Sequence, residues 1–233
     1  MFRRLDPQRL VETAHRLANR VGERFPGSGL ADLTKELIMV AEHTAADREW
    51  FARPNLGLRI LTTAAIGLLI FVAAGTIIVV TRLPASAGIT DAIQAIDAGV
   101  NDLVFLGVAI YFLATLEVRH KRRRALKAIH ELRSMAHIVD MHQLTKDPER
   151  VRMGDESPDT PSSPVRTLTV FQLSRYLDYC SESLSLLSKF AALYVQDFDD
   201  PVTMSAVNEV ENLTNGLSRK IWQKIMILDH AEG

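Results

Sequence analysis

The chain has 233 residues, with 27 lysine and arginine side chains against 28 aspartate and glutamate side chains, and a formal net charge of -1. A protein dedicated to nucleic acid is disfavoured, because such proteins carry a basic surplus. The single cysteine, Cys180, excludes an intrachain disulfide and a zinc site made of several cysteines. The hydrophobic content of 47% is ordinary, but the apolar residues are distributed very unevenly along the chain.

Residues 1–55 are predicted to form a cytosolic hairpin of two amphipathic helices. Asp6 followed by Pro7 is typical of a helix N-terminus, and apolar residues then recur at helical spacing up to Phe25. Residues 26–29 read Pro-Gly-Ser-Gly and predict a break. A second helix is expected to follow and to lead into an uncharged stretch.

This uncharged stretch, 60–81, has 22 residues and predicts a first transmembrane helix within 56–81. At 1.5 Å per residue it makes a helix of about 33 Å, which matches the hydrocarbon core of a bilayer. A fully buried core helix is the alternative, but helices that are apolar on all sides over this length are rare in soluble proteins. A cleaved signal peptide is disfavoured, because about 55 residues precede the stretch.

The second predicted transmembrane helix covers 98–116 and follows an external loop at 82–97. Its uncharged part, 103–116, is about 21 Å long as a helix and is too short alone. Extension back to residue 98 gives about 28 Å and places Asp102 near the outer end, where a carboxylate costs much less free energy than at the bilayer centre. The two helices are therefore predicted to form a transmembrane hairpin.

The basic residues beside these helices predict their orientation. Three arginines precede the first helix at 48–59, one lies in the loop, and six cations follow the second helix. Cytoplasmic flanks carry the excess of Lys and Arg, so both termini are predicted to be cytoplasmic. Arginine outnumbers lysine 20 to 7, which favours a GC-rich bacterial source. We therefore expect a multi-pass protein of the bacterial inner membrane.

Three cytosolic segments are predicted after the second span. Residues 117–147 form a membrane-proximal helix, 148–166 form a flexible linker, and 167–233 form an antiparallel helical hairpin. In the hairpin, apolar residues alternate at spacings of four and three, which is typical of a helix-packing seam that needs a partner, within the chain or in a second chain. The residues of this predicted assembly seam are Leu173, Leu177, Leu184, Leu187 and Tyr194.

Polar residues on these helices suggest three candidate sites. Carboxylates at a membrane mouth often line cation paths, although they can also lie just outside the lipid. A basic run beside a span favours anionic lipid head groups, although it can serve topology alone. A polar face opposite an apolar seam is either solvated or a docking face. The residues are Asp97, Asn101 and Asp102 for a pore mouth, Lys121, Arg122, Arg123 and Arg124 for lipid head groups, and His130, Arg133, His137 and Asp140 for docking.

The histidines of the membrane-proximal helix do not predict a metal site. His130 and His137 are seven residues apart, or about 10.5 Å along a helix, whereas zinc holds its ligands about 2 Å from one point. No metal and no cofactor are therefore expected.

The sequence contains no phosphate-binding glycine loop, no GxSxG and no HExxH, and Cys180 falls on an apolar seam. Together with the absence of strand-like alternation, this predicts a non-enzymatic, all-α membrane protein: a two-helix transmembrane hairpin whose N- and C-terminal cytosolic helices form a helical bundle. We expect a homo-oligomeric, membrane-anchored scaffold or regulator with a protein partner at these helices. The alternative is an ion-conducting pore. The layout is similar in outline to two-span membrane effectors of bacterial defence systems, on architecture alone.

Overall fold

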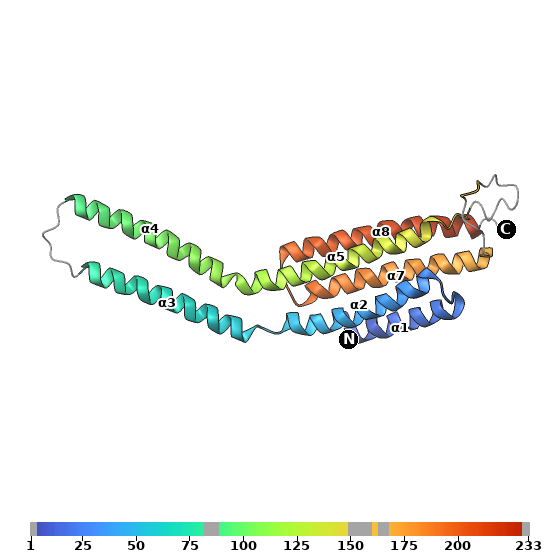
Figure 1. Ribbon diagram of the computed structural model, residues 1–233, viewed down its shortest axis with the longest axis horizontal. Coiled ribbons are helices and arrows are strands. Elements are labelled where there is room, and N and C mark those ends of the chain that lie inside the picture. The colour runs from blue at the N-terminus through green and yellow to red at the C-terminus, as the bar shows by residue number, and fades with distance from the viewer. Residues whose placement is uncertain (1–3, 82–88, 149–159, 163–167, 230–233) are drawn as a thin grey trace. The chain divides into compact units, whose positions relative to one another are not determined.

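The computed structural model describes residues 4–81, 89–148, 160–162 and 168–229. These residues contain seven α-helices and no β-strand, so the all-helical prediction is confirmed for this part of the chain. The helices, drawn in Figure 1, are α1 (Pro7–Arg24), α2 (Gly29–Ala52), α3 (Leu56–Thr81), α4 (Ile89–Ala114), α5 (Leu116–Leu144), α7 (Val170–Gln196) and α8 (Pro201–Asp229).

The chain divides into two compact units. The first, here called the bundle unit, contains Met1–Ala52 and Arg124–Gly233, and the second, the apolar-helix unit, contains Arg53–Arg123. The predicted N-terminal and C-terminal segments thus belong to one bundle. Most of the predicted linker, 148–166, lies outside the described residues.

One apolar core holds the bundle unit together, and α1, α2, α5, α7 and α8 all contribute to it. α7 contacts α1, α2 and α8. A helix covered from several sides must be apolar around much of its circumference, and α7 meets that requirement. Its completely buried side chains are Leu177, Cys180, Leu184, Leu187, Phe190 and Ala191.

Local sequence signals set several helix ends in the bundle unit. The Asp6 side chain accepts hydrogen bonds from two backbone N–H groups of the first turn of α1, and Pro7 is the first helical residue, as predicted. Between α1 and α2, Gly27 has a φ of 69°, in the left-handed region that favours glycine. Thr169 and Gln172 form a capping box at the start of α7. These signals fix where the helices begin before any packing is considered.

The C-terminal end of α5 is capped by a side chain of α8. Lys224 Nζ donates hydrogen bonds to the carbonyl oxygens of Gln143, at 2.8 Å, and Lys146, at 3.1 Å. The last carbonyls of a helix lack intrahelical partners, and a cation there complements the helix dipole. Burial lowers the pKa of the Lys224 ammonium, although the charges of Asp147 and Asp140 oppose that shift. This cap links α5 to α8 at a polar point.

The apolar-helix unit has the opposite arrangement of apolar side chains. α3 and α4 contact each other, yet no residue of the stretches Leu56–Gly75 and Asp97–Ala114 is buried. Both stretches are long and apolar enough to cross a membrane. A core helix of a soluble protein would be mostly buried, which α3 and α4 are not.

Thr115 is the residue between α4 and α5. Its N–H donates to the carbonyl oxygen of Tyr111 at 3.1 Å, and its own carbonyl accepts from the N–H of Arg119 at 3.0 Å. The helical bonding pattern therefore continues from α4 into α5. The Thr115 hydroxyl also donates to the carbonyls of Tyr111 and Phe112, an arrangement that tends to bend a helix.

Candidate functional site

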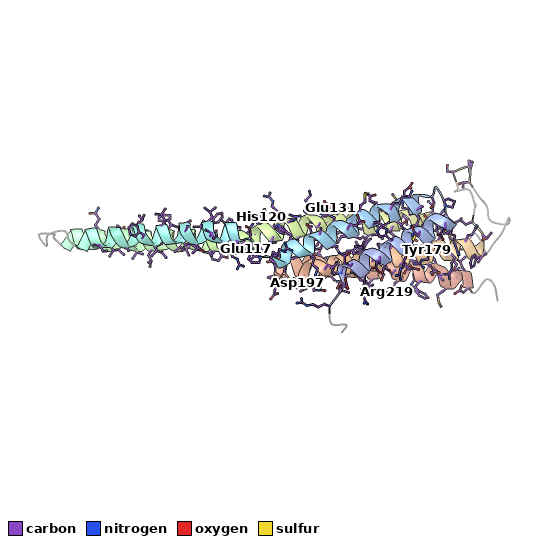
Figure 2. The ribbon with its side chains drawn as sticks, turned by 90° about the horizontal axis from the view of Figure 1, so that it is seen from below. Glu117, His120, Glu131, Tyr179, Asp197 and Arg219 are labelled. Carbon is purple, nitrogen blue, oxygen red and sulfur yellow. The ribbon has the colours of Figure 1, made fainter. Side chains whose placement is uncertain are left out.

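Glu117, labelled in Figure 2, is the centre of a charged cluster in the apolar-helix unit. Its carboxylate accepts hydrogen bonds from Arg59 Nε at 2.7 Å and the Asn55 N–H at 3.2 Å, and it pairs with Lys121 Nζ at 3.2 Å. Lys121 Nζ also donates to the carbonyl oxygen of Arg53 at 3.0 Å. These five residues, the Glu117 cluster, tie the start of α3 to the start of α5.

The Glu117 cluster favours the ionised carboxylate. Burial alone raises the pKa of the Glu117 carboxyl, but the bonds from Arg59, Asn55 and Lys121 outweigh burial and lower the pKa below its ordinary value. Charge-assisted hydrogen bonds of this kind are stronger than neutral ones. The Glu117 carboxylate is therefore ionised at neutral pH.

The bundle unit contains a second organising carboxylate, Asp47 of α2, whose side chain is 1% exposed. It accepts hydrogen bonds from Arg124 Nε at 3.0 Å and the Tyr194 hydroxyl at 3.3 Å, and His43 Nε2 lies 3.5 Å away. The Arg124 guanidinium also lies over the Trp50 ring, 4.5 Å from its centroid. These five residues form the Asp47 cluster, which joins α2, α5 and α7.

A buried carboxylate is stable only when it is paired and hydrogen-bonded, and the Asp47 cluster supplies both conditions. Burial raises the pKa of the Tyr194 phenol, so the hydroxyl keeps its proton and donates a hydrogen bond to Asp47. Hydrogen bonds from Arg124 and Tyr194 thus satisfy the Asp47 carboxylate inside the bundle, and a satisfied polar network of this kind favours one arrangement of the helices that it joins.

The residues predicted for a pore mouth lie on α4. Asp97, Asn101 and Asp102 are all exposed. Asp97 and Asn101 are four residues apart and share one face, whereas Asp102 is rotated by about 100° from Asn101. A ring of such side chains requires further copies of the chain.

The side chains of the predicted lipid-binding run have different surroundings. Lys121 belongs to the Glu117 cluster and Arg124 to the Asp47 cluster. Arg122 is half-buried and Arg123 is exposed. Lys121 and Arg124 therefore serve bonds within the chain.

The docking-face prediction concerns α5. Among its residues, His130, Arg133 and His137 are exposed and Asp140 is half-buried. Arg133 Nη1 pairs with Glu209 of α8 at 3.2 Å. Part of this face is therefore turned toward α8, and the two histidines remain at the surface.

The predicted assembly seam is covered by the chain's own helices. Its members Leu173, Leu177, Leu184, Leu187 and Tyr194 are all buried. Cys180 lies among them, and burial raises the pKa of its thiol to about 12. The thiol is therefore un-ionised and unreactive at neutral pH. Of the two partners that the sequence left open, the structure supplies the one within the chain.

The bundle unit has an open cavity of about 420 Å³ between α2 and α5, and another of about 430 Å³ where the turn between α1 and α2 meets the end of α5 and the start of α7. The polar and charged side chains of the first are Glu36, His43, Thr44, Lys127, Glu131 and Tyr194, of which Glu131 is labelled in Figure 2. Charges of both signs line this cavity, so it has no clear preference for an anion or a cation. Within the described ranges, no three His, Cys, Asp or Glu side chains come close enough to hold a metal ion.

The sequence-based predictions did not include Asp47 or Glu117. A signal existed for Asp47, because it falls on the stripe of α2 that contains Leu37 and Ala41, where a carboxylate needs a partner. Glu117 stands four residues before Lys121, a spacing that predicts an ion pair. Its bond to Arg59 could not be predicted, since nothing in the spacing of distant residues reveals it.

These features define the class of protein: an all-helical chain with a helical bundle and two helices apolar enough to cross a membrane. No protein-family model matches the sequence, and neither a curated protein nor a solved structure matches it. Its function must therefore be inferred from its own residues and their geometry.

Proposed function

We propose that the protein is a non-enzymatic, membrane-anchored scaffold or regulator of the bacterial inner membrane. α3 and α4 cross the bilayer as a hairpin, and the cytosolic bundle unit contacts a second copy or a protein partner. The exposure of α3 carries this proposal: Phe71 is 76% exposed within a helix whose apolar stretch has a mean hydropathy of 2.1. Such a surface is unfavourable in water and favourable in lipid.

The Glu117 cluster supports the hairpin and its orientation. Arg59 and Asn55 stand at the start of α3, and they bond to Glu117, three residues after the end of α4. The two helices therefore begin and end at the same side. That side carries the arginines and lysines, which is the cytoplasmic pattern.

Exposed apolar side chains on the bundle unit support a partner surface. Trp222 and Met226 are four residues apart on α8, so they share one face, and each is more than half exposed. Large apolar side chains grouped at a surface often mark contact sites. We therefore propose this surface of α8 as the contact site, in place of the α7 seam that the chain's own helices cover.

The buried Cys180 allows a topology test in the full-length chain. Glu12→Cys in α1 and Gln94→Cys in α4 each add one exposed thiol. In intact bacterial cells, a membrane-impermeant maleimide is expected to label Gln94→Cys, and Glu12→Cys only after permeabilisation. The wild type, with Cys180 alone, is the control and stays unlabelled. Labelling of Glu12→Cys in intact cells, or of Gln94→Cys only after permeabilisation, contradicts the proposal.

The mass of the intact protein in detergent tests the assembly. The chain mass is 26.0 kDa, and we expect a multiple of it or a complex with a partner protein. A monomer that co-purifies with nothing contradicts the scaffold role. Trp222→Ala is expected to lower the assembled fraction if α8 supplies the contact.

A second candidate function is an oligomeric ion-conducting pore. It is favoured by the exposed carboxylate of Asp97, which stands at the first residue of the apolar stretch of α4. In liposomes, Asp97→Asn and Asp102→Asn are expected to reduce cation flux if copies of α4 line a path. Unchanged flux, or no flux with the wild type, removes these residues from a conduction role.

A further inference from the structure

The basic side chains at the start of α5 do not all face the same way. Lys121 is 9% exposed and is held by the Glu117 carboxylate and the Arg53 carbonyl oxygen. Arg119 and Arg123 are instead exposed. They are four residues apart, so they share one face of α5.

The same face continues into α4 at Phe112. The hydrogen bonds through Thr115 keep the helical pattern across the junction, and positions 7 and 11 residues after Phe112 then lie within about 20° of it around the axis. The Arg119 guanidinium lies over the Phe112 ring, 4.7 Å from its centroid. Phe112 itself is about half exposed. An aromatic ring and two guanidinium groups therefore form one outward face.

The acidic residue nearest to this face in sequence does not oppose an anion there. The Glu117 carboxylate is bonded to Arg59, Asn55 and Lys121. Its charge is compensated within the Glu117 cluster. The face of Arg119 and Arg123 is consequently net positive.

We propose that the face formed by Phe112, Arg119 and Arg123 binds an anionic phospholipid. The phosphate lies between the two guanidinium groups, and an acyl chain lies along Phe112. Guanidinium groups bind phosphate oxygens through paired, charge-assisted hydrogen bonds. Basic side chains beside a span favour lipids with a net negative head group over zwitterionic ones. The inference rests on the proposed function, because α4 must cross the bilayer.

This assignment differs from the one made from the sequence alone. The basic run predicts Lys121, Arg122, Arg123 and Arg124 together, because the spacing does not say which side chains turn inward. The structure engages Lys121 and Arg124 within the chain and adds Arg119, which stands two residues before that run.

Native mass spectrometry of the full-length protein in detergent tests the proposal, with phosphatidylglycerol and phosphatidylcholine as the probes. The wild type is expected to bind phosphatidylglycerol about tenfold more tightly than phosphatidylcholine. The double variant Arg119→Gln/Arg123→Gln is expected to lose this preference. The matched control Arg219→Gln/Lys220→Gln removes two charges from exposed positions of α8 and is expected to keep it.

Two further measurements sharpen the result. Phe112→Ala is expected to weaken the binding of both lipids while the preference for phosphatidylglycerol remains. Inorganic phosphate is expected not to compete at the concentrations used, and full competition by it would show a phosphate site rather than a lipid site. Resistance of Cys180 to maleimide verifies that each variant is folded.

Equal binding of the two lipids by the wild type would overturn the proposal, as would equal loss of preference in both double variants. This failure is distinguishable from a failure of the proposed function. If only the lipid site is wrong, the labelling of Gln94→Cys and Glu12→Cys keeps its expected pattern. If α4 does not cross the bilayer, that pattern fails as well.

Discussion

The bundle unit and the apolar-helix unit use apolar helices in opposite ways. In α7 the apolar side chains point inward, and Phe190 is completely buried. In α3 they point outward, and Phe71 is 76% exposed. The helices have similar lengths, 27 and 26 residues, so length does not distinguish them. This contrast is the one that the proposed function requires, with water around the bundle unit and lipid around α3 and α4.

Both units contain a charged cluster around a carboxylate, but the clusters connect different parts. The Asp47 cluster joins three helices of a packed core. The Glu117 cluster joins two helix starts in a unit whose apolar side chains are exposed. A buried ion pair adds little net stability compared with apolar packing, but its loss is costly and it specifies one arrangement. In the apolar-helix unit, the polar bonds of the Glu117 cluster therefore contribute more to the arrangement of α3 and α5 than to the net free energy of folding.

The test with the largest expected effect replaces one phenylalanine in each of the two units. Phe190→Ala is expected to lower the free energy of unfolding of the bundle unit by about 3–5 kcal/mol, because it leaves a cavity in the core. Phe71→Ala, the matched control, removes the same atoms from an exposed position and is expected to change it by less than about 0.5 kcal/mol. Chemical unfolding of the full-length protein in detergent measures both. Equal losses would mean that α3 belongs to a packed core.

The second test concerns the Asp47 cluster. Asp47→Asn is expected to cost about 2 kcal/mol, less than a fully buried pair, because the Arg124 side chain is 44% exposed and keeps some contact with water. Asp32→Asn on the same helix is the control, since Asp32 is 70% exposed, and it is expected to cost less than about 0.5 kcal/mol. Thermal unfolding compares the two variants. If Asp47→Asn leaves the midpoint of thermal unfolding unchanged, the Asp47 cluster does not stabilise the packing of α2, α5 and α7.

The third test uses two glycines of the bundle unit. A Cβ at Gly29 would lie 2.5 Å from His142 Cε1, so Gly29→Ala is expected to cost about 1 kcal/mol, and His142→Ala in the same chain is expected to recover it. Gly22 has no neighbour within 4 Å of that position and lies inside α1, so Gly22→Ala is expected to stabilise by about 0.5–1 kcal/mol. If Gly29→Ala and Gly22→Ala both raise or both lower the free energy of unfolding, the close approach of α2 to α5 at Gly29 is contradicted.

The smallest expected effect is the pH dependence of the Glu117 cluster. Because the pKa of Glu117 is lowered in the folded state, its contribution to stability is present at neutral pH and is lost as the pH falls through that lowered pKa. The midpoint of thermal unfolding of Glu117→Gln should therefore lie below that of the wild type at pH 7, and the difference should vanish in acid. A difference that stays constant across this pH range would show that the charge of Glu117 is not what stabilises the unit.

The candidate sites illustrate how far residue spacing can predict. The apolar stripes of α1, α5 and α7 are periodic, so their burial could be predicted with its register. The division of the basic residues at the start of α5 into Lys121 and Arg124, which are bonded to Glu117 and Asp47, and Arg119 and Arg123, which are exposed, could not be predicted. It depends on where Asp47 and Glu117 lie in space, and neither carboxylate is close in sequence to all its partners.

The helices, and the contrast between apolar and amphipathic ones, follow from residues that are close together in the sequence. Capping residues such as Asp6 and Thr169, and the period of the apolar residues, act over a few neighbouring positions and are visible without a fold. The closure of the α7 seam by the chain's own helices, and the central positions of Asp47 and Glu117 in the charged clusters, depend instead on three-dimensional contacts. These contacts join residues separated by tens to more than a hundred positions, and the free energy that selects them comes from packing rather than from local propensity.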